Sequence, residues 1–376
     1  MHTYPPPPVT FVRGEGSYLF DADGKRYLDF LSGLAVTSLG HAHPAVRAAL
    51  HEQAGTLLHV SNLFGTTVGP AVAATLDRLV GGGGRVFFCN SGAEANECAL
   101  KLARKWAGPG RYAVVSAYGS FHGRTLATLA ATGQPQKHEP FQPLPEGFRH
   151  VAWGDVDDLA RAVDPGVVDA VLLEPVQGEG GVNAATPEYF GAVRRLCDER
   201  GVLMIVDEVQ TGLGRTGRWF GFQHLGVTPD VVTMAKALGN GVPMGACWAR
   251  ADVADAFVPG DHATTFGGQP LATAAARAVL RVMEEEDVPA RAVAAGERLR
   301  KGLEALDGVT TVRGLGLLLA AELSAVDART ATSRALDAGL VVNAVTEGAI
   351  RLAPSLLVSD EEIDEALAIL STVVQA

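Results

Sequence analysis

LMIVDEVQTGLGRTG, residues 203–217, is the stretch that decides how this chain folds. An uninterrupted apolar run stops at an acid, Asp207, as expected of a strand buried in a sheet that is covered on both faces. The carboxyl end of such a strand lies at the edge where open α/β sheets bind ligands. The stretch therefore predicts a buried strand that ends in a functional carboxylate. A helix cap or turn cap is the ordinary alternative role for an aspartate.

The glycines of the same stretch form a G-x-G-x-x-G pattern at Gly212, Gly214 and Gly217. A dinucleotide-binding loop needs its first glycine directly after the strand, a helix that opens at the third, and an acid about 20 residues later. Here residues 207–211 intervene, no apolar helix follows, and no acid lies near position 237. We interpret the match as accidental and the glycines as loop positions with positive φ.

Similar apolar runs recur between stretches with helical periodicity, at residues 85–90, 112–117, 169–175 and 230–236. This alternation predicts a parallel sheet with helices on both faces. Before it, residues 14–33 predict a hairpin around the turn Asp23-Gly24. After it, long amphipathic helices from about residue 270 and further strands predict an α+β unit. We assign residues 46–269 to a large domain, and residues 1–45 and 270–376 to a small α+β domain.

Composition narrows the function classes. The 376 residues carry a formal net charge of -11, which argues against non-specific binding to nucleic acid or to anionic membranes, because both need clustered Lys and Arg. The four cysteines include no C-x-x-C pair, and we expect no metal site. No apolar run approaches the ~18 residues of a membrane span, and the N-terminus lacks a signal-peptide pattern. We expect a cytoplasmic protein.

Lys236 follows the apolar run at 230–233 and has small or apolar neighbours. Parallel strands would place the ends of this run and of the Asp207 run on one sheet edge, so that an amine and a carboxylate could face the same ligand. Pyridoxal phosphate (PLP) needs such a pair: a lysine for a Schiff base, and a carboxylate that keeps the ring nitrogen protonated. A surface lysine is the ordinary alternative.

Other motifs carry groups that suit the same ligand. The free N–H groups of residues 91–93, where a helix begins after the run at 85–90, attract a phosphate. Phe121 can stack on a flat ring and Arg124 can pair with a carboxylate, although a core ring and a surface charge are the ordinary alternatives. Arg351 lies in an apolar frame and should have an anionic partner. Glu179 and Glu174 follow another strand, where a glutamate could simply be solvated.

Seven motifs, in this order, resemble those of the class III aminotransferases of fold type I: NSGAEANE, FHGRT, EPVQGEGGV, VDEVQTGLGRTG, AKALGNG, TTFGGQP and RLAPSL. The resemblance runs from about residue 10 to the C-terminus, and it is nearest to members that act on N2-acetylornithine. It implies PLP as the cofactor, held by a large domain with a mostly parallel seven-stranded sheet covered by helices. It also implies a homodimer with shared active sites.

The resemblance also assigns roles to residues. Lys236 would form the Schiff base and Asp207 would contact the ring nitrogen as the two catalytic residues. The cofactor-binding set would be Ser91, Gly92, Ala93, Phe121, Asp207, Glu208, Val209, Gln210, Lys236 and, from the other subunit, Thr265. The substrate-binding set would be Leu34, Arg124, Glu179, Thr264 and Arg351.

These assignments imply a reaction. Arg124 would take the distal carboxylate of the amine donor, and Glu179 would mask Arg351 until the α-carboxylate of glutamate displaces it. Leu34 stands where relatives that act on free ornithine carry a tyrosine, which favours an acylated donor. We expect transfer of the δ-amino group of N2-acetylornithine to 2-oxoglutarate, giving N-acetylglutamate 5-semialdehyde and glutamate, a step of arginine biosynthesis.

Alternatives remain at this point. The same scaffold could serve succinylornithine, an acyl-lysine precursor, ornithine, 4-aminobutyrate or another primary amine. A dehydrogenase is supported only by the glycine pattern at 212–217. A non-catalytic PLP-binding regulator lacks any DNA-binding segment or basic patch in this chain. One departure from the family pattern is Gln269, where the family commonly has Asn.

Overall fold

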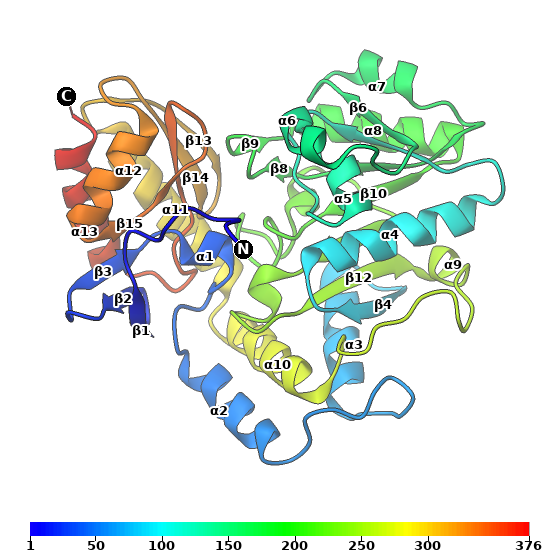
Figure 1. Cartoon of the computed structure of the whole chain (residues 1–376), viewed down its shortest axis with the longest axis horizontal. Coiled ribbons are helices and arrows are strands. Elements are labelled where there is room, and N and C mark those ends of the chain that lie inside the picture. The colour runs from blue at the N-terminus through cyan, green and yellow to red at the C-terminus, as the bar shows by residue number, and fades with distance from the viewer. Residues whose placement is uncertain (376) are drawn as a thin grey trace.

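The computed structural model describes residues 1–375, which form two lobes (Figure 1). The larger lobe is built on a seven-stranded sheet with the strand order β4-β12-β11-β10-β7-β5-β6. Its strands are β4 (Gly84–Cys89), β12 (Gly245–Arg250), β11 (Val231–Met234), β10 (Leu203–Asp207), β7 (Val168–Leu173), β5 (Ala113–Ala117) and β6 (Phe148–Val151). In this sheet β12 runs antiparallel to β11 and β4, and the other pairings are parallel. The expected mostly parallel, covered sheet is confirmed.

The central strands are buried along their whole length because helices cover both faces. Successive residues of β10 point to opposite faces: Leu203 and Ile205 pack with the residues of α4 (Gly92–Ala107), whereas Met204 and Val206 pack with those of α8 (Pro187–Arg200). Further helices of this lobe are α3 (Val68–Val80), α5 (Leu126–Ala131), α7 (Val156–Ala162) and α9 (Ala251–Ala254).

The smaller lobe joins both ends of the chain. Its main sheet, in the order β13-β14-β17-β16, consists of β13 (Val309–Leu315), β14 (Leu318–Leu323), β17 (Ala349–Leu352) and β16 (Asn343–Ala344). The N-terminal strands are β1 (Phe11–Glu15), β2 (Tyr18–Asp21) and β3 (Arg26–Asp29), and β3 pairs with β15 (Leu340–Val341). The helices are α11 (Val288–Glu304), α12 (Ala328–Asp337) and α13 (Asp360–Val373). The expected hairpin around Asp23-Gly24 is present as β2 and β3.

Helix α10 (Pro270–Glu285) packs on α2 (Pro44–Ala54) and α3, and it also contacts α11. It therefore connects the two lobes, and the domain limits of 46–269 against 1–45 and 270–376 stay a prediction. The remaining elements are short: α1 (Ser32–Ala35), α6 (Pro135–His138), β8 (Val176–Gln177), β9 (Asn183–Ala184), and the 3-10 turns η1 (Glu139–Phe141), η2 (Gly221–His224) and η3 (Lys236–Leu238).

The glycine-rich loop after β10 joins the lobes. No α-helix opens at its third glycine, and Gly214 and Gly217 adopt φ angles of 90° and 92°. A Cβ atom on Gly214 would lie 2.7 Å from Val288 Cγ1, so that glycine is needed for close packing against α11. Arg215 is buried in this loop and donates to the carbonyls of Leu317 and Pro354 in the smaller lobe. The glycines thus shape a loop that contacts the other lobe. This agrees with the interpretation that their match to a dinucleotide-binding pattern is accidental.

The four cysteines are buried and unbridged. Across residues 1–375, none of the helices combines the length and the apolar character needed to cross a membrane.

Candidate active site

A pocket of roughly 390 Å³ opens at the carboxyl edge of the large sheet. It lies where the start of α4, the loop around residue 121, the end of β10 and the segment after β11 meet. Most residues predicted from the sequence line it: Ser91, Gly92, Ala93, Phe121, Arg124, Glu179, Asp207, Val209, Gln210 and Lys236. The topology explains this convergence, because parallel strands end on one edge and the loops that follow them share it.

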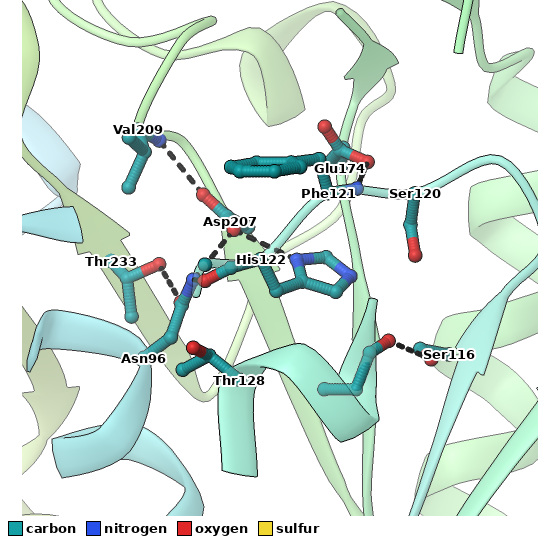
Figure 2. Close-up of polar contacts among 12 residues, drawn as sticks. Asn96, Ser116, Ser120, Phe121, His122, Thr128, Glu174, Asp207, Val209 and Thr233 are labelled. Carbon is teal, nitrogen blue, oxygen red and sulfur yellow. Dashed lines mark hydrogen bonds and ion pairs between the residues drawn. The ribbon is translucent and has the colours of Figure 1, made fainter. Parts of the chain in front are cut away.

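Asp207 is the most firmly held group of the pocket, with 4% of its surface exposed. Its Oδ2 accepts a hydrogen bond from Asn96 Nδ2 and pairs with His122 Nδ1, both at 2.8 Å, while its Oδ1 accepts from the Val209 N–H at 3.0 Å (Figure 2). These donors compensate for the burial of a carboxylate and fix its orientation.

Sequence reasoning missed Asn96 and His122. Asn96 is tied to the sheet by the Thr233 hydroxyl, which donates to Asn96 Oδ1 at 2.7 Å, and its own amide also donates to the His122 carbonyl. The available signals were weak: His122 is the neighbour of Phe121 in FHGRT, and Asn96 lies one turn into α4, on the face that packs against β11.

Lys236 begins η3, just beyond β11, and it adopts a φ of 42°. Asp207 is in register with Thr233, so the lysine lies three residues past the partner of the acid. Burial lowers the pKa of Lys236 to about 8, with Glu179 opposing and Arg351 reinforcing the shift. The neutral, nucleophilic form of the amine is therefore accessible close to physiological pH.

The N-terminus of α4 forms an anion cradle. Ser91 caps the helix by accepting the Glu94 N–H at 3.2 Å, and Glu94 in turn accepts the Asn90 N–H at 2.8 Å. Within residues 1–375, the N–H groups of residues 91–93 have no hydrogen-bond acceptor. A Cβ atom on Gly92 would lie 2.7 Å from Val209 Cγ1, so only glycine lets the cradle approach the Val209 side chain. Such a helix start suits a phosphate.

Glu174 lies at the end of β7, and it is buried rather than solvated as the sequence allowed. Its Oε2 accepts the Phe121 N–H at 3.2 Å, and Figure 2 shows the Phe121 ring beside the Asp207 carboxylate. Burial raises the pKa of Glu174 well above its ordinary value, and the charge of Asp207 raises it further. Both effects favour the protonated form of Glu174.

Arg351 and Glu179 form an ion pair across the two lobes. Arg351 lies in β17 with 1% of its surface exposed, and its Nη1 donates to Glu179 Oε1 at 2.6 Å and to Gln210 Oε1 at 3.2 Å. Burial pushes the pKa of Glu179 upward, but Arg351 and Lys236 outweigh it, so the pKa is lowered. The anionic partner expected for Arg351 is present, and Glu179 stands between Arg351 and the pocket.

Glu208 stays a predicted cofactor-binding residue, although its side chain is buried outside the pocket. Its Oε2 accepts from the Thr211 hydroxyl at 2.5 Å and from the Gly221 N–H at 2.9 Å, and its Oε1 accepts from the Phe222 N–H at 2.8 Å. Adjacent residues after a strand point in opposite directions, and Glu208 uses its carboxylate to hold the loop together.

Four other predicted residues, including Arg351, also lie outside this pocket, and Gln269 has a structural role. Thr264 and Thr265 line a neighbouring hollow of the same chain. Leu34 is exposed and has a φ of 69° in the kinked segment α1. Gln269, the departure from the family pattern, accepts the Val60 N–H at 3.0 Å through its Oε1.

The donor set fits PLP: an amine of lowered pKa, a fixed carboxylate, an aromatic face and a phosphate cradle on one pocket. Comparisons with known proteins point the same way. The chain matches the sequence profile of the family Aminotransferase class-III over residues 1–374.

Three relatives illustrate the likeness. The acetylornithine aminotransferase of Caldanaerobacter subterraneus is 48% identical, over 99% of this chain and 96% of its own length. The N-acetylornithine aminotransferase of Stenotrophomonas maltophilia superposes with a TM-score of 0.86 at 38% identity, covering 98% of this chain and 96% of that structure. The ornithine aminotransferase of Toxoplasma gondii, with PLP at partial occupancy in its active site, superposes with a TM-score of 0.93 at 36% identity, covering 100% of this chain and 91% of that structure.

Replacement of Lys236 tests the central assignment. Lys236→Ala should abolish the borohydride-reducible covalent link to PLP, because Lys236 supplies the amine of lowered pKa in the pocket. The link is measured as added mass on the intact protein after reduction. Lys301→Ala, which changes an exposed lysine of α11, is the matched control and should keep the link. A reducible link that persists in Lys236→Ala would contradict the assignment.

Proposed function

The chain belongs to the class III aminotransferase family, and from this premise we propose that it transfers the δ-amino group of N2-acetylornithine to 2-oxoglutarate. The products are N-acetylglutamate 5-semialdehyde and glutamate, and the reaction serves arginine biosynthesis. The protein is a PLP-dependent aminotransferase. The names of its relatives support the acylated substrate, and the ion pair of Glu179 with Arg351 is the observation that carries the proposal.

Each group of the pocket has a task toward the cofactor. Bound PLP supplies an electron sink, which allows an amino group to leave a primary amine and to be passed to an oxo acid. Lys236 Nζ would hold the cofactor, and its lowered pKa suits it to carry a proton to and from the reacting carbon of the substrate. Asp207 would be the partner of the ring nitrogen, and the N–H groups of residues 91–93 would hold the phosphate. Phe121 would stack on the ring.

The ion pair explains how one pocket serves two substrates. The donor presents an amine with no carboxylate on the reacting carbon, whereas glutamate presents an α-carboxylate there. A free Arg351 would favour the wrong end of the donor, but Glu179 neutralises it at 2.6 Å. When glutamate arrives, its carboxylate competes with Glu179 for the guanidinium. Arg124, exposed at the rim, binds the distal carboxylate of either substrate.

We also propose that the enzyme is a homodimer in which Thr265 of each subunit serves the site of the other. The supporting feature is an apolar face formed by Leu57, Leu58, Leu63, Phe64 and Phe266. Leu63 is 84% and Phe64 71% exposed, and both line the hollow that also contains Thr265. Apolar side chains concentrated in this way mark a protein interface, and a second copy fits because Thr265 is outside the pocket of its own chain.

A panel of amine donors tests the activity. With 2-oxoglutarate as acceptor, N2-acetylornithine should give the highest kcat/KM, at least about tenfold above ornithine and 4-aminobutyrate. The reason is that Arg124 can bind the distal carboxylate, and that Leu34 stands where relatives that act on free ornithine carry a tyrosine. Succinylornithine and an acyl-lysine precursor complete the panel. Glutamate formation is measured. A preference for free ornithine or 4-aminobutyrate would refute the proposed substrate.

Replacement of Glu179 tests the two-substrate mechanism. Glu179→Ala frees Arg351 and should shift the ratio of single-turnover rates toward the glutamate half-reaction by about tenfold or more, since a charge-assisted pair is lost for the donor alone. The rates are followed by the absorbance of the cofactor. Glu146→Ala, at an exposed loop position, is the control. An unchanged ratio would be evidence against the mechanism.

Disruption of the apolar face tests the homodimer. Phe64→Asp places a charge on this face and should convert most of the protein to monomer at micromolar concentration, with weaker retention of PLP. Light scattering after size exclusion measures the mass. Val293→Asp, at an exposed apolar position on α11 in the smaller lobe, should stay dimeric. A wild-type protein that is monomeric would overturn the proposal.

A further inference from the structure

Two cationic side chains lie beside the Phe121 ring. Arg124 comes from the loop that follows Phe121, and its Cζ is 5.5 Å from the ring centroid. Lys137 comes from the separate short helix α6, and its Nζ is 5.1 Å from the same centroid. Attraction to the aromatic ring helps to hold each cation, so both stay beside a ring that lines the pocket containing Lys236.

These cations lack an acid of their own. In the part of the chain that the structure describes, neither the Arg124 guanidinium nor the Lys137 amine is hydrogen-bonded or ion-paired. By contrast, the lysines on the outer face of α4 do find acceptors: Lys101 bonds to the Asp261 carbonyl and Lys105 to the Asp261 carboxylate.

Lys137 is coupled electrostatically to the site. Burial lowers its pKa, the charge of Arg124 lowers it further, and Glu179 raises it. The charges of Arg124 and of Glu179 in the pocket therefore both affect the pKa of Lys137. Two like charges that share one aromatic ring repel each other, and an anion bound between them would relieve that repulsion.

We propose that Lys137 is a substrate-binding residue which, together with Arg124, holds the carboxylate of the amine donor that is remote from the reacting amine. The inference rests on the proposed function and extends it to a second cation. The planar Arg124 group can take both oxygens of a carboxylate, and the Lys137 ammonium adds a point charge from another element. With two cations, the site discriminates more strongly against donors that lack this carboxylate.

The holoenzyme of Lys137→Met tests this role, because methionine keeps an unbranched apolar stem and removes only the charged end. The informative substrate pair is N2-acetylornithine and N-acetylputrescine, which differ only by the carboxylate. For N2-acetylornithine, KM should rise about tenfold with kcat changed by less than about twofold, as for the loss of one charge-assisted contact. For N-acetylputrescine, KM should stay unchanged. Lys137→Arg should restore binding, and Lys301→Met is the matched control.

Equal losses with both donors would mean that Lys137 only supports Phe121, and they would overturn the proposal, as would unchanged kinetics. A second measurement separates this inference from the proposed function. N-acetyl-L-norvaline carries the acyl group and the carboxylate but no side-chain amine, and its Kd is measured by calorimetry. If the wild type does not use N2-acetylornithine, the proposed function fails, while an approximately tenfold weaker Kd in Lys137→Met still supports the carboxylate site. Equal Kd values for the wild type and Lys137→Met, or no binding of N-acetyl-L-norvaline to the wild type, would overturn the proposed role of Lys137.

Discussion

The need of a buried carboxylate for hydrogen-bond donors organises this protein. Asp207 ends a strand in the middle of the large sheet, where water cannot solvate it, and its donors come from different elements: Asn96 from α4, and His122 from the loop after β5. The same elements carry the phosphate cradle and Phe121. Asn96 is also bound to Thr233 of β11, the strand that leads to Lys236. The contacts that stabilise one acid therefore bring together the elements that carry Lys236, Phe121 and the start of α4.

The pocket shifts the pKa values of Glu174 and Glu179 in opposite directions, and both acids affect the pKa of Lys236. Glu174 and Glu179 both act on Lys236, and either one as an anion raises the pKa of the amine. Burial and Asp207 raise the pKa of Glu174, which favours its neutral form. Arg351 keeps Glu179 ionised and at the same time lowers the pKa of Lys236. Burial, together with Arg351, therefore keeps the pKa of the amine lowered in a pocket with three carboxyl groups.

The sequence predicts well whatever depends on local pattern. The largely apolar runs of β5, β7, β10 and β11 predict a covered sheet, and the parallel order alone places Asp207 and Lys236 at one edge. The strand β6 (FRHV) has no apolar run, and the short run of small residues in β12 (GACWAR) was not predicted to be a strand.

Contacts between distant residues were harder to predict. The bond from Asn96 to Asp207 joins positions 111 residues apart, and the position of Lys137 beside Phe121 depends on how α6 packs. Glu208 shows the opposite limit: the family resemblance suggested a role at the cofactor beside Asp207, but the Glu208 side chain bonds to the loop that follows β10 and lies outside the pocket. The strand order also has a consequence for the folding of this chain during its synthesis on the ribosome. Strand β4, which leads into the phosphate cradle, lies at the edge of the sheet and pairs with β12 alone, from the far end of the domain. β4 can therefore join the sheet only after β12 has left the ribosome, so a nascent chain cannot capture its cofactor early. Until β12 pairs with it, β4 must stay shielded from other strands.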